Sequence, residues 1–398
     1  MLSDTSLPVI KATLPVVGEH IEEIAKRFYK HMFEARPDLL DGLFNRGNQA
    51  DGRQQQALAG SIAAFATMLV EKPDQVPDHL LSRVAHKHVS LGLSPDQYQI
   101  VHDHLIWAIV DVLGDAVTPE VAAAWDEVYW LMANALIAIE DRLYAQQGTV
   151  AGDVWREWEV TGRTEETEDV ATFRISPADG TPAPVFRPGQ YVSVQVELPD
   201  GARQIRQYSL SSAPGSPQRS ITVKRVHGGD TPDGEVSRHL HAHTRPGDRL
   251  RVSAPYGDLV LDAVDAPLFL ASAGIGCTPM LSMLDHLSST GHRSPVTVVH
   301  GDRSPADHAL RADHTRLTDR LPDASAHFWY ENPAPGHPAD RTGLVDLTDL
   351  VVPAGTHAYL CGPLPFMRTV RAQLLAKGLP AADIHYEVFG PDLWLAQA

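Results

Sequence analysis

The stretch LFLASAGIGCTP, residues 268–279, changes from a strand pattern to a helix start within a few residues. Its first four residues form an apolar run that suits a buried strand, and Met280 to Leu287 has a helix-like pattern. The loop between them is Ala273-Gly274-Ile275-Gly276-Cys277-Thr278-Pro279. Its glycines would let a pyrophosphate approach the free N–H groups at the helix start. The loop lacks the full GxGxxG fingerprint, so a tight turn without a ligand remains an alternative at this point.

Strands and helices continue to alternate toward the end of the chain. Val296 to His300 forms a strand-like run, and Ala358 to Leu360 is followed by a helix-like stretch from Met367 to Leu375. This alternation is typical of βαβ units, and it predicts a doubly wound α/β domain over residues 263–398.

Upstream of this domain the pattern is that of an all-β domain. Strand-like runs such as Tyr191 to Val196 and Ser220 to Val226 occur between Trp155 and Asp262. Turn dipeptides separate such runs: Pro188-Gly189, Gly228-Gly229 and Pro246-Gly247. We expect an antiparallel β-barrel over residues 152–262.

The first part of the chain is helical in pattern. Apolar residues recur there at three- and four-residue steps in two series: Leu14, Val17, Ile21, Ile24 and Phe28, and then Val101, Leu105, Ile109 and Val112. A polar, glycine-bearing join follows from Gln146 to Gly152. We therefore expect an all-α domain over residues 1–147, and a multidomain chain in the order helical, barrel, α/β.

Composition agrees with this organisation and excludes some partners. The chain has 398 residues, more than one hydrophobic core usually serves. Asp and Glu outnumber Lys and Arg by 50 to 33, and the net charge of -17 disfavours nucleic acid and anionic lipid surfaces. The two cysteines, Cys277 and Cys361, are too few for a disulfide framework or a thiolate zinc site, so a reducing cytoplasm fits best.

The sequence also argues against a secretion signal and a membrane crossing. Asp4 stands where a signal peptide has positive charge, and Pro8 and Pro15 interrupt the apolar run. The longest nearly uncharged stretch, Tyr129 to Ile139, has about half the length that a bilayer span requires and contains Asn134.

Three motifs in the last two predicted domains resemble those of the ferredoxin reductase family. Cys361-Gly362-Pro363 directly follows a strand, and Val388-Phe389-Gly390-Pro391 lies near the end of the chain. In the barrel, Arg206-Gln207-Tyr208-Ser209-Leu210 matches the RxYS element that holds the flavin of FAD in that family. The family's order of motifs is kept, so the resemblance implies an FAD-binding barrel followed by an NAD(P)-binding domain.

The chemistry of the barrel motif suits a flavin. Arg206 can bridge phosphate oxygens with its planar guanidinium, Tyr208 offers an aromatic face to the isoalloxazine, and Ser209 can hydrogen-bond a ring nitrogen. The alternative is an ordinary exposed tyrosine on a strand. By resemblance, Tyr191 is a second FAD contact, and Ser237, after Val236, lies where the family wraps the cofactor's diphosphate.

The end of the chain carries the residues expected beside the flavin where the nicotinamide arrives. The resemblance implies that Glu387 lies near the electron path and that Phe389 covers the flavin ring. A packed terminal strand is the alternative reading.

In the helical domain, Ala85-His86-Lys87-His88-Val89-Ser90 precedes Pro95-Asp96-Gln97-Tyr98, and this resembles the F helix and following corner of a bacterial globin. The resemblance makes His88 the proximal haem ligand. His86 is the rival, but two residues along a helix turn a side chain by roughly 200°, so both cannot face one iron. The motif alignment selects His88.

The resemblance also implies a partner system for that imidazole. Tyr98 and Glu140 would hydrogen-bond it, and such partners make an imidazole donate more electron density to iron. A solvated surface charge is the alternative for Glu140, because Asp141 and Arg142 follow it. The last globin helix of the family is matched by four residues: Trp125, Tyr129, Asn134 and Glu140.

On the distal side, Tyr29 falls where family members direct a hydroxyl at bound oxygen. Gln54 and Leu58 are four residues apart on one helical face, and they match the distal polar and apolar pair. Phe44 matches the ring that wedges the haem, although core packing alone would explain Phe44 and Leu58. Lys87 matches a residue that meets a haem propionate, with an ordinary surface lysine as the alternative.

Together these resemblances cover the whole chain and identify it with the flavohaemoglobins. They imply haem b, FAD and NADH or NADPH as cofactors, and a nitric oxide dioxygenase activity that converts NO and O2 to nitrate with electrons from NAD(P)H. The family also implies a monomer in the cytoplasm. One departure is Cys277, where flavohaemoglobins usually carry Gln, so a side-chain contact to the nucleotide is in question there.

Two other functions remain open from the sequence. The chain could be a haem-based O2 or NO sensor that gates a flavin reductase, or a hydroperoxide or quinone reductase. Slow haem reduction beside fast reduction of external acceptors would indicate the sensor. The choice between NADH and NADPH depends on loop residues near Arg303 and Arg311, so the sequence leaves both nucleotides open.

Overall fold

The computed structural model describes residues 1–44, 46–50, 52–74, 78–229, 233–263, 265–333 and 341–390. The chain forms two compact units. The first consists mainly of Met1–Trp155 and the second of Arg156–Val196 with Arg206–Phe389. Each unit is described by itself below.

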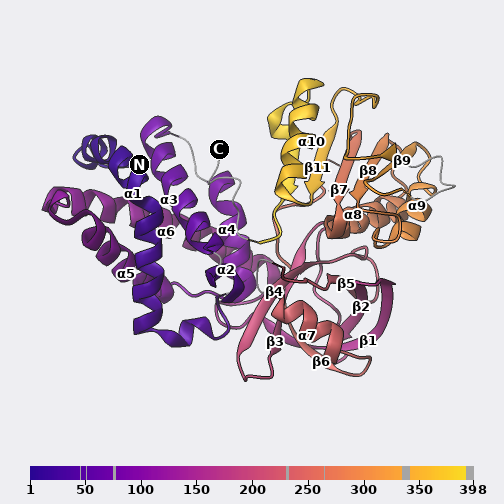
Figure 1. The fold of residues 1–398 in the computed structure, drawn as a ribbon, viewed down its shortest axis with the longest axis horizontal. Helices are drawn as coiled ribbons and strands as arrows, with labels where there is room; N and C mark the ends of the chain where they lie inside the picture. The colour runs from indigo at the N-terminus through magenta and orange to yellow at the C-terminus, as the bar shows by residue number, and fades with distance from the viewer. Residues whose placement is uncertain are drawn as a thin grey trace. The chain divides into compact units, whose positions relative to one another are not determined.

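The first unit is helical (Figure 1). Its helices are α1 (Ser6–Ala35), α2 (Arg46–Ala50), α3 (Arg53–Glu71), α4 (Asp78–Leu91), α5 (Asp96–Leu113) and α6 (Pro119–Gln147), with 3-10 turns at Pro37–Leu40 and Gly114–Ala116. Local chemistry sets the ends of α6. The Thr118 hydroxyl accepts the N–H of Val121 at its start, and Gly148 ends it with a left-handed φ of +64°.

The core of this unit follows the helical period of the sequence. Ile10, Val17, Ile24 and Phe28 of α1 are each 2% exposed or less, and α1 packs against α3, α5 and α6. Burial of such side chains stabilises the fold by about 1.5–3 kcal/mol each. The predicted all-α domain is confirmed.

The second unit begins with an antiparallel sheet. Its strands are β1 (Trp155–Thr167), β2 (Val170–Pro177), β3 (Tyr191–Glu197), β4 (Arg203–Ser209), β5 (Arg219–Lys224) and β6 (Arg249–Ser253), and α7 (Glu235–His243) follows β5. The strand order is β4-β3-β6-β1-β2-β5. A bridge between Leu210, just after β4, and Ile221 of β5 joins the two edge strands, so the sheet closes as a barrel.

A second, parallel sheet completes the unit. Its elements are β7 (Leu268–Ala273), α8 (Cys277–Thr290), β8 (Val296–Asp302), α9 (Arg311–Thr318), β9 (Ala324–Tyr330), β10 (Arg341–Thr342), β11 (His357–Cys361), α10 (Leu364–Ala376) and β12 (Ile384–Glu387). The order is β10-β9-β8-β7-β11-β12, and the described strand pairs are parallel. The strand order reverses between β7 and β11, which is where open α/β sheets bind ligands.

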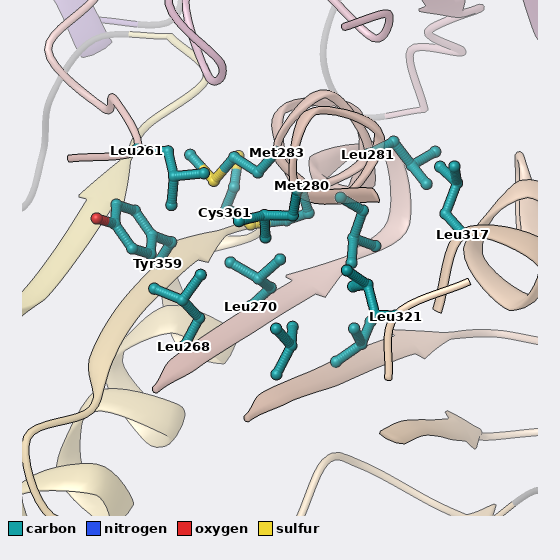
Figure 2. Packing of buried hydrophobic residues seen from close by; sticks show 14 of the residues in the cluster. Leu261, Leu268, Leu270, Met280, Leu281, Met283, Leu317, Leu321, Tyr359 and Cys361 are labelled. Atoms are coloured by element: carbon teal, nitrogen blue, oxygen red, sulfur yellow. The ribbon is translucent and has the colours of Figure 1, made fainter. Parts of the chain in front are cut away.

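Helix α8 covers one face of this sheet through apolar packing. In Figure 2, Met280 and Met283 of α8 lie over Leu268 and Leu270 of β7, beside Cys361 of β11. All five are 2% exposed or less. This packing fixes the start of α8 over the carboxyl end of β7, and the predicted doubly wound α/β domain is confirmed.

Within the described residues, no helix combines the length and apolar character that a membrane span requires.

Candidate functional site

His88, near the end of α4, forms a hydrogen-bonded group with two other side chains. The His88 Nδ1 lies 2.8 Å from Glu140 Oε1 of α6 and 3.0 Å from the Tyr98 hydroxyl of α5. The Tyr98 hydroxyl also donates to Glu140 Oε1, at 2.5 Å. One carboxylate oxygen therefore serves both partners, and His88 keeps its Nε2 for a further ligand.

Burial makes this group more than a surface contact. Glu140 is only 3% exposed, and a buried carboxylate is costly unless hydrogen bonds compensate the lost hydration. Burial, and then the Glu140 charge, raise the pKa of Tyr98, so Tyr98 stays a neutral donor. The group is suited to orient an imidazole and to increase its electron density.

A second polar group is buried among aromatic rings in the same unit. Tyr29 is 5% exposed, and its ring centroid lies 5.7 Å from that of Phe33 and 5.9 Å from that of Phe44. Burial raises the pKa of Tyr29 to about 12, while a hydrogen bond with the Gln54 side chain lowers it. Tyr29 is thus a protonated hydroxyl in apolar surroundings.

The remaining residues expected around a haem take ordinary positions on their helices. Gln54 and Leu58 are half-buried, one turn apart on α3. Lys87 precedes His88 on α4 and is also half-buried.

At its end, strand β4 of the barrel carries a polar set of four residues: Arg206, Gln207, Tyr208 and Ser209. Arg206 and Tyr208 are half-buried, and burial raises the pKa of Tyr208 while the Arg206 charge lowers it. Gln207 Nε2 donates to Ser193 Oγ at 3.0 Å. Ser209 is buried, and its hydroxyl has no hydrogen-bond partner among the described residues. An unmet buried hydroxyl costs about 1–3 kcal/mol, so this position fits a ligand that hydrogen-bonds it.

Two further barrel residues are held by the protein itself. Tyr191 is 7% exposed and pairs with Tyr256 in an antiparallel bridge. The Ser237 hydroxyl accepts the N–H of Val226 and donates to the carbonyl of Gly234, so it is already engaged at the start of α7.

The glycine loop after β7 meets the loop after β11 at the reversal of strand order. A Cβ at Gly276 would lie 2.3 Å from the Cys361 carbonyl oxygen, so only glycine permits this approach. Gly274 has a φ of +52°, which favours glycine, and a Cβ there would meet nothing within 4 Å. The result is an open backbone cradle at the start of α8, as pyrophosphates require.

Side chains of this loop turn inward. Cys277 is fully buried, with its thiol 3.8 Å from the Ala309 carbonyl, and burial raises its pKa. Thr278 donates its hydroxyl to the Ile275 carbonyl at 3.1 Å, and Pro279 is buried. The loop therefore offers backbone groups rather than the Cys277 side chain.

The carboxyl ends of β11 and β12 bring two motifs side by side. Cys361 pairs in register with Glu387, and Gly362 and Pro363 lead into α10. Glu387 is 5% exposed. In the adjoining motif Val388 is half-buried, Phe389 is 46% exposed and Gly390 has a φ of +125°, whereas Pro391 lies outside the described residues.

One cluster of side chains in this unit was not predicted from the sequence. The side chains of His300, His308 and His314 meet in the interior. Their spacing of eight and six residues across a predicted strand and the segment after it was the available signal. It is weak, because the chain has 20 histidines.

The chain matches three protein families in order. These are "Globin" over residues 26–136, "Oxidoreductase FAD-binding domain" over 157–261 and "Oxidoreductase NAD-binding domain" over 270–372. Among solved structures, the flavohemoglobin from Malassezia yamatoensis with bound FAD and heme is 41% identical, with a TM-score of 0.89, over 98% of this chain and 100% of that one.

Further similarities agree. The flavohem-like FAD/NAD-binding domain of nitric oxide dioxygenase from Vibrio cholerae is 36% identical over 59% of this chain and 99% of its own, with a TM-score of 0.56. A flavohemoprotein of Chromobacterium violaceum is 41% identical over 98% of each chain. One of Rhizobium meliloti is 42% identical over 99% of this chain and its own full length, and the chain therefore belongs to the flavohemoprotein family.

Proposed function

We propose that this flavohemoprotein is a nitric oxide dioxygenase that converts NO and O2 to nitrate with electrons from NADH or NADPH. One observation carries the proposal: a buried carboxylate and a phenol hold Nδ1 of His88, in the same helical unit as the buried Tyr29 hydroxyl. The FAD- and NAD-binding domains that follow supply the reductase.

The helical unit would hold haem b. When bound, haem supplies the iron at which O2 and NO combine, and FAD divides the two electrons of a hydride into single electrons. His88 Nε2 would hold the iron. Tyr98 and Glu140 would fix the ring and increase its electron donation through Nδ1, and Lys87 would meet a propionate.

The distal residues act on the gaseous substrates. Tyr29 would donate a hydrogen bond to O2 in the pocket, and Gln54 would orient that hydroxyl and add an amide donor. A protonated donor in apolar surroundings stabilises negative charge that develops on oxygen. Phe44 and Leu58 would form apolar walls that exclude water.

The barrel would bind FAD through the polar set at the end of β4. Arg206 would neutralise phosphate, and Tyr208 would lie against the isoalloxazine. Ser209 would use its unmet hydroxyl on a flavin ring atom. Gln207, through Ser193, and Tyr191 would shape this wall. Near the diphosphate, α7 would offer N–H groups, since the Ser237 hydroxyl is engaged.

The parallel sheet would bind the nicotinamide nucleotide where its strand order reverses. Backbone groups of Gly274-Ile275-Gly276-Cys277-Thr278-Pro279 would receive the pyrophosphate, and Cys361-Gly362-Pro363 would line the opposite side. Glu387-Val388-Phe389-Gly390 would lie beside the flavin, with Glu387 near the hydride path.

The proposal includes three further properties of the chain: its domain boundaries, its oligomeric state and its location. We place the domain boundaries at 1–147, 152–262 and 263–398. We also infer a cytoplasmic location, which the low cysteine content supports, and a monomer, the state that the family resemblance implies.

NO consumption by purified protein loaded with haem and FAD tests the proposal. An NO electrode in aerated buffer should record rapid loss of NO that stops without nicotinamide, with two NO molecules consumed per nicotinamide oxidised, since each hydride carries two electrons. Slow NO loss beside rapid ferricyanide reduction would instead indicate a sensor that gates a reductase.

A further inference from the structure

Three histidines meet in the interior of the parallel-sheet domain, in a place that the proposed oxidoreductase function does not use. His300 lies on β8, His308 lies between β8 and α9, and His314 lies on α9. They are 0%, 3% and 0% exposed. One ring nitrogen from each comes within 4.8 Å of the other two.

Hydroxyl groups hold the Nδ1 atoms of two of these rings. Ser272 Oγ lies 2.9 Å from His300 Nδ1. The Tyr330 hydroxyl lies 2.7 Å from His308 Nδ1. Outer hydrogen-bond partners of this kind orient the ring of a metal-binding histidine.

His314 completes the group and leaves a polar atom unmet. Its Nδ1 lies 2.9 Å from His308 Nε2. Its Nε2 is buried and has no hydrogen-bond partner within the described part of the chain. A cation between His308 Nε2 and His314 Nδ1 would take the lone pairs of both nitrogens, with the His314 proton then on Nε2.

One further observation favours a cation over a purely packed cluster. The Asp302 carboxylate, with a 6% exposed side chain, lies 3.4 Å from His300 Nε2 and provides compensating negative charge.

We propose that His300, His308 and His314 form a binding site for a divalent transition-metal cation of the Zn²⁺ type. Tetrahedral zinc holds imidazole nitrogens at about 2.0–2.1 Å, which separates two such nitrogens by roughly 3.3 Å. The 2.9 Å between His308 and His314 needs only a small opening to reach that separation.

Binding requires one defined rearrangement. The His300 and His308 rings stack with centroids 3.9 Å apart and an interplanar angle of 21°. A metal lies in the plane of each imidazole that binds it, so one of these rings must turn out of the stack. The bound cation would then tie β8 to α9 across Leu310, which already adopts a left-handed φ of +59°.

The test measures zinc on the complete protein with haem and FAD in place. Equilibrium dialysis against Zn²⁺, followed by metal analysis, should give one tightly held zinc per chain. The variant His314→Gln should lower that affinity on the order of 100-fold or more, because one of three ligands is lost. Equal zinc affinity in His314→Gln and the parent would overturn the proposal.

His239→Gln is the matched control. His239 lies on α7 with a buried, unpartnered Nδ1, and its ring centroid is 5.0 Å from that of His243, so it resembles the cluster without a third ring. The tight zinc should persist in this variant. Its disappearance there would assign the zinc to α7 and overturn the proposal.

X-ray absorption at the zinc edge of the parent protein gives a readout that does not depend on how the variants fold. It is separate from the iron edge and counts imidazoles around zinc. Three imidazole nitrogens at about 2.0–2.1 Å are expected. Two or fewer imidazoles, or no retained zinc at all, would show that the cluster is a hydrogen-bonded network and nothing more.

Discussion

The helical unit and the α/β domain build their candidate sites from different material. In the helical unit, the polar chemistry around His88 consists of side chains that meet across three helices. In the α/β domain, the cradle at Gly274 and Gly276 consists of backbone, because the Cys277 side chain packs inward. Substitution of one residue in a side-chain site can remove a function while the fold persists. A site made of backbone groups is altered only when a substitution changes the path of the chain.

The largest effect is expected from His88→Ala. Without its imidazole the helical unit loses normal haem ligation, and NO consumption should fall on the order of 100-fold or more. Ferricyanide reduction by nicotinamide should stay within about twofold of the parent, since the FAD and nucleotide sites keep their residues.

His86→Ala is the control for this variant, because it removes an imidazole from the same helix. It should retain the haem absorption spectrum of the parent. A normal spectrum in His88→Ala, or loss of haem ligation in His86→Ala, would move the assignment to His86.

Gly276→Ala tests the backbone site. The added Cβ would lie 2.3 Å from the Cys361 carbonyl oxygen, so the loops after β7 and β11 must separate. We expect nicotinamide oxidation to fall by about 10- to 100-fold with every electron acceptor, because misplacement near 1 Å has that effect on positioned reactants.

Gly291→Ala provides the comparison for that change. Gly291 ends α8 with a φ of +75°, and a Cβ there meets nothing within 4 Å. Its substitution strains the backbone without touching the cradle, so stability should drop slightly while nicotinamide oxidation stays normal. Equal kinetic losses in the two variants would argue against the cradle.

Tyr29→Phe sharpens the side-chain half of the comparison. Loss of one hydrogen bond of about 1.4 kcal/mol should accelerate O2 dissociation about tenfold in stopped-flow measurements. Burial raises the pKa of Tyr29 to about 12, so its hydroxyl stays protonated below that value. The rate of O2 dissociation from the parent should therefore not change with pH up to about 10. An unchanged rate of O2 dissociation in Tyr29→Phe would show that Tyr29 takes no part in the mechanism.

Cys277→Ser has the smallest expected effect. The thiol contacts the Ala309 carbonyl in the interior, so the KM for nicotinamide should stay within about threefold of the parent. A larger change in KM, with stability preserved, would show that this side chain takes part in nucleotide binding and that the site is not backbone alone.

Much of the fold could be predicted from local patterns. The apolar steps in α1 and the strand-loop-helix at 268–279 depend on neighbours in sequence, and both were confirmed. Closure of the barrel through Leu210 and Ile221 depends on register, which no local pattern specifies.

Less of the candidate site could be predicted from the sequence, because its residues are brought together by contacts that no local pattern specifies. Tyr98 and Glu140 are 42 residues apart, and no periodicity brings them together, so only a family resemblance suggested that they meet. The inward turn of Cys277 and the meeting of His308 with His314 depend on side-chain packing. The glycine loop was readable because its chemistry lies in the residue type itself.

The most direct test of the proposed function follows the oxygen atoms. Protein loaded with haem and FAD is supplied with NO, nicotinamide and O2 labelled with the heavy isotope oxygen-18, and the nitrate is analysed by mass spectrometry. A dioxygenase places both atoms of O2 in each nitrate, so every product molecule should carry two labelled oxygens. Nitrate with one label, or nitrite or nitrous oxide as the main product, would contradict the dioxygenase function.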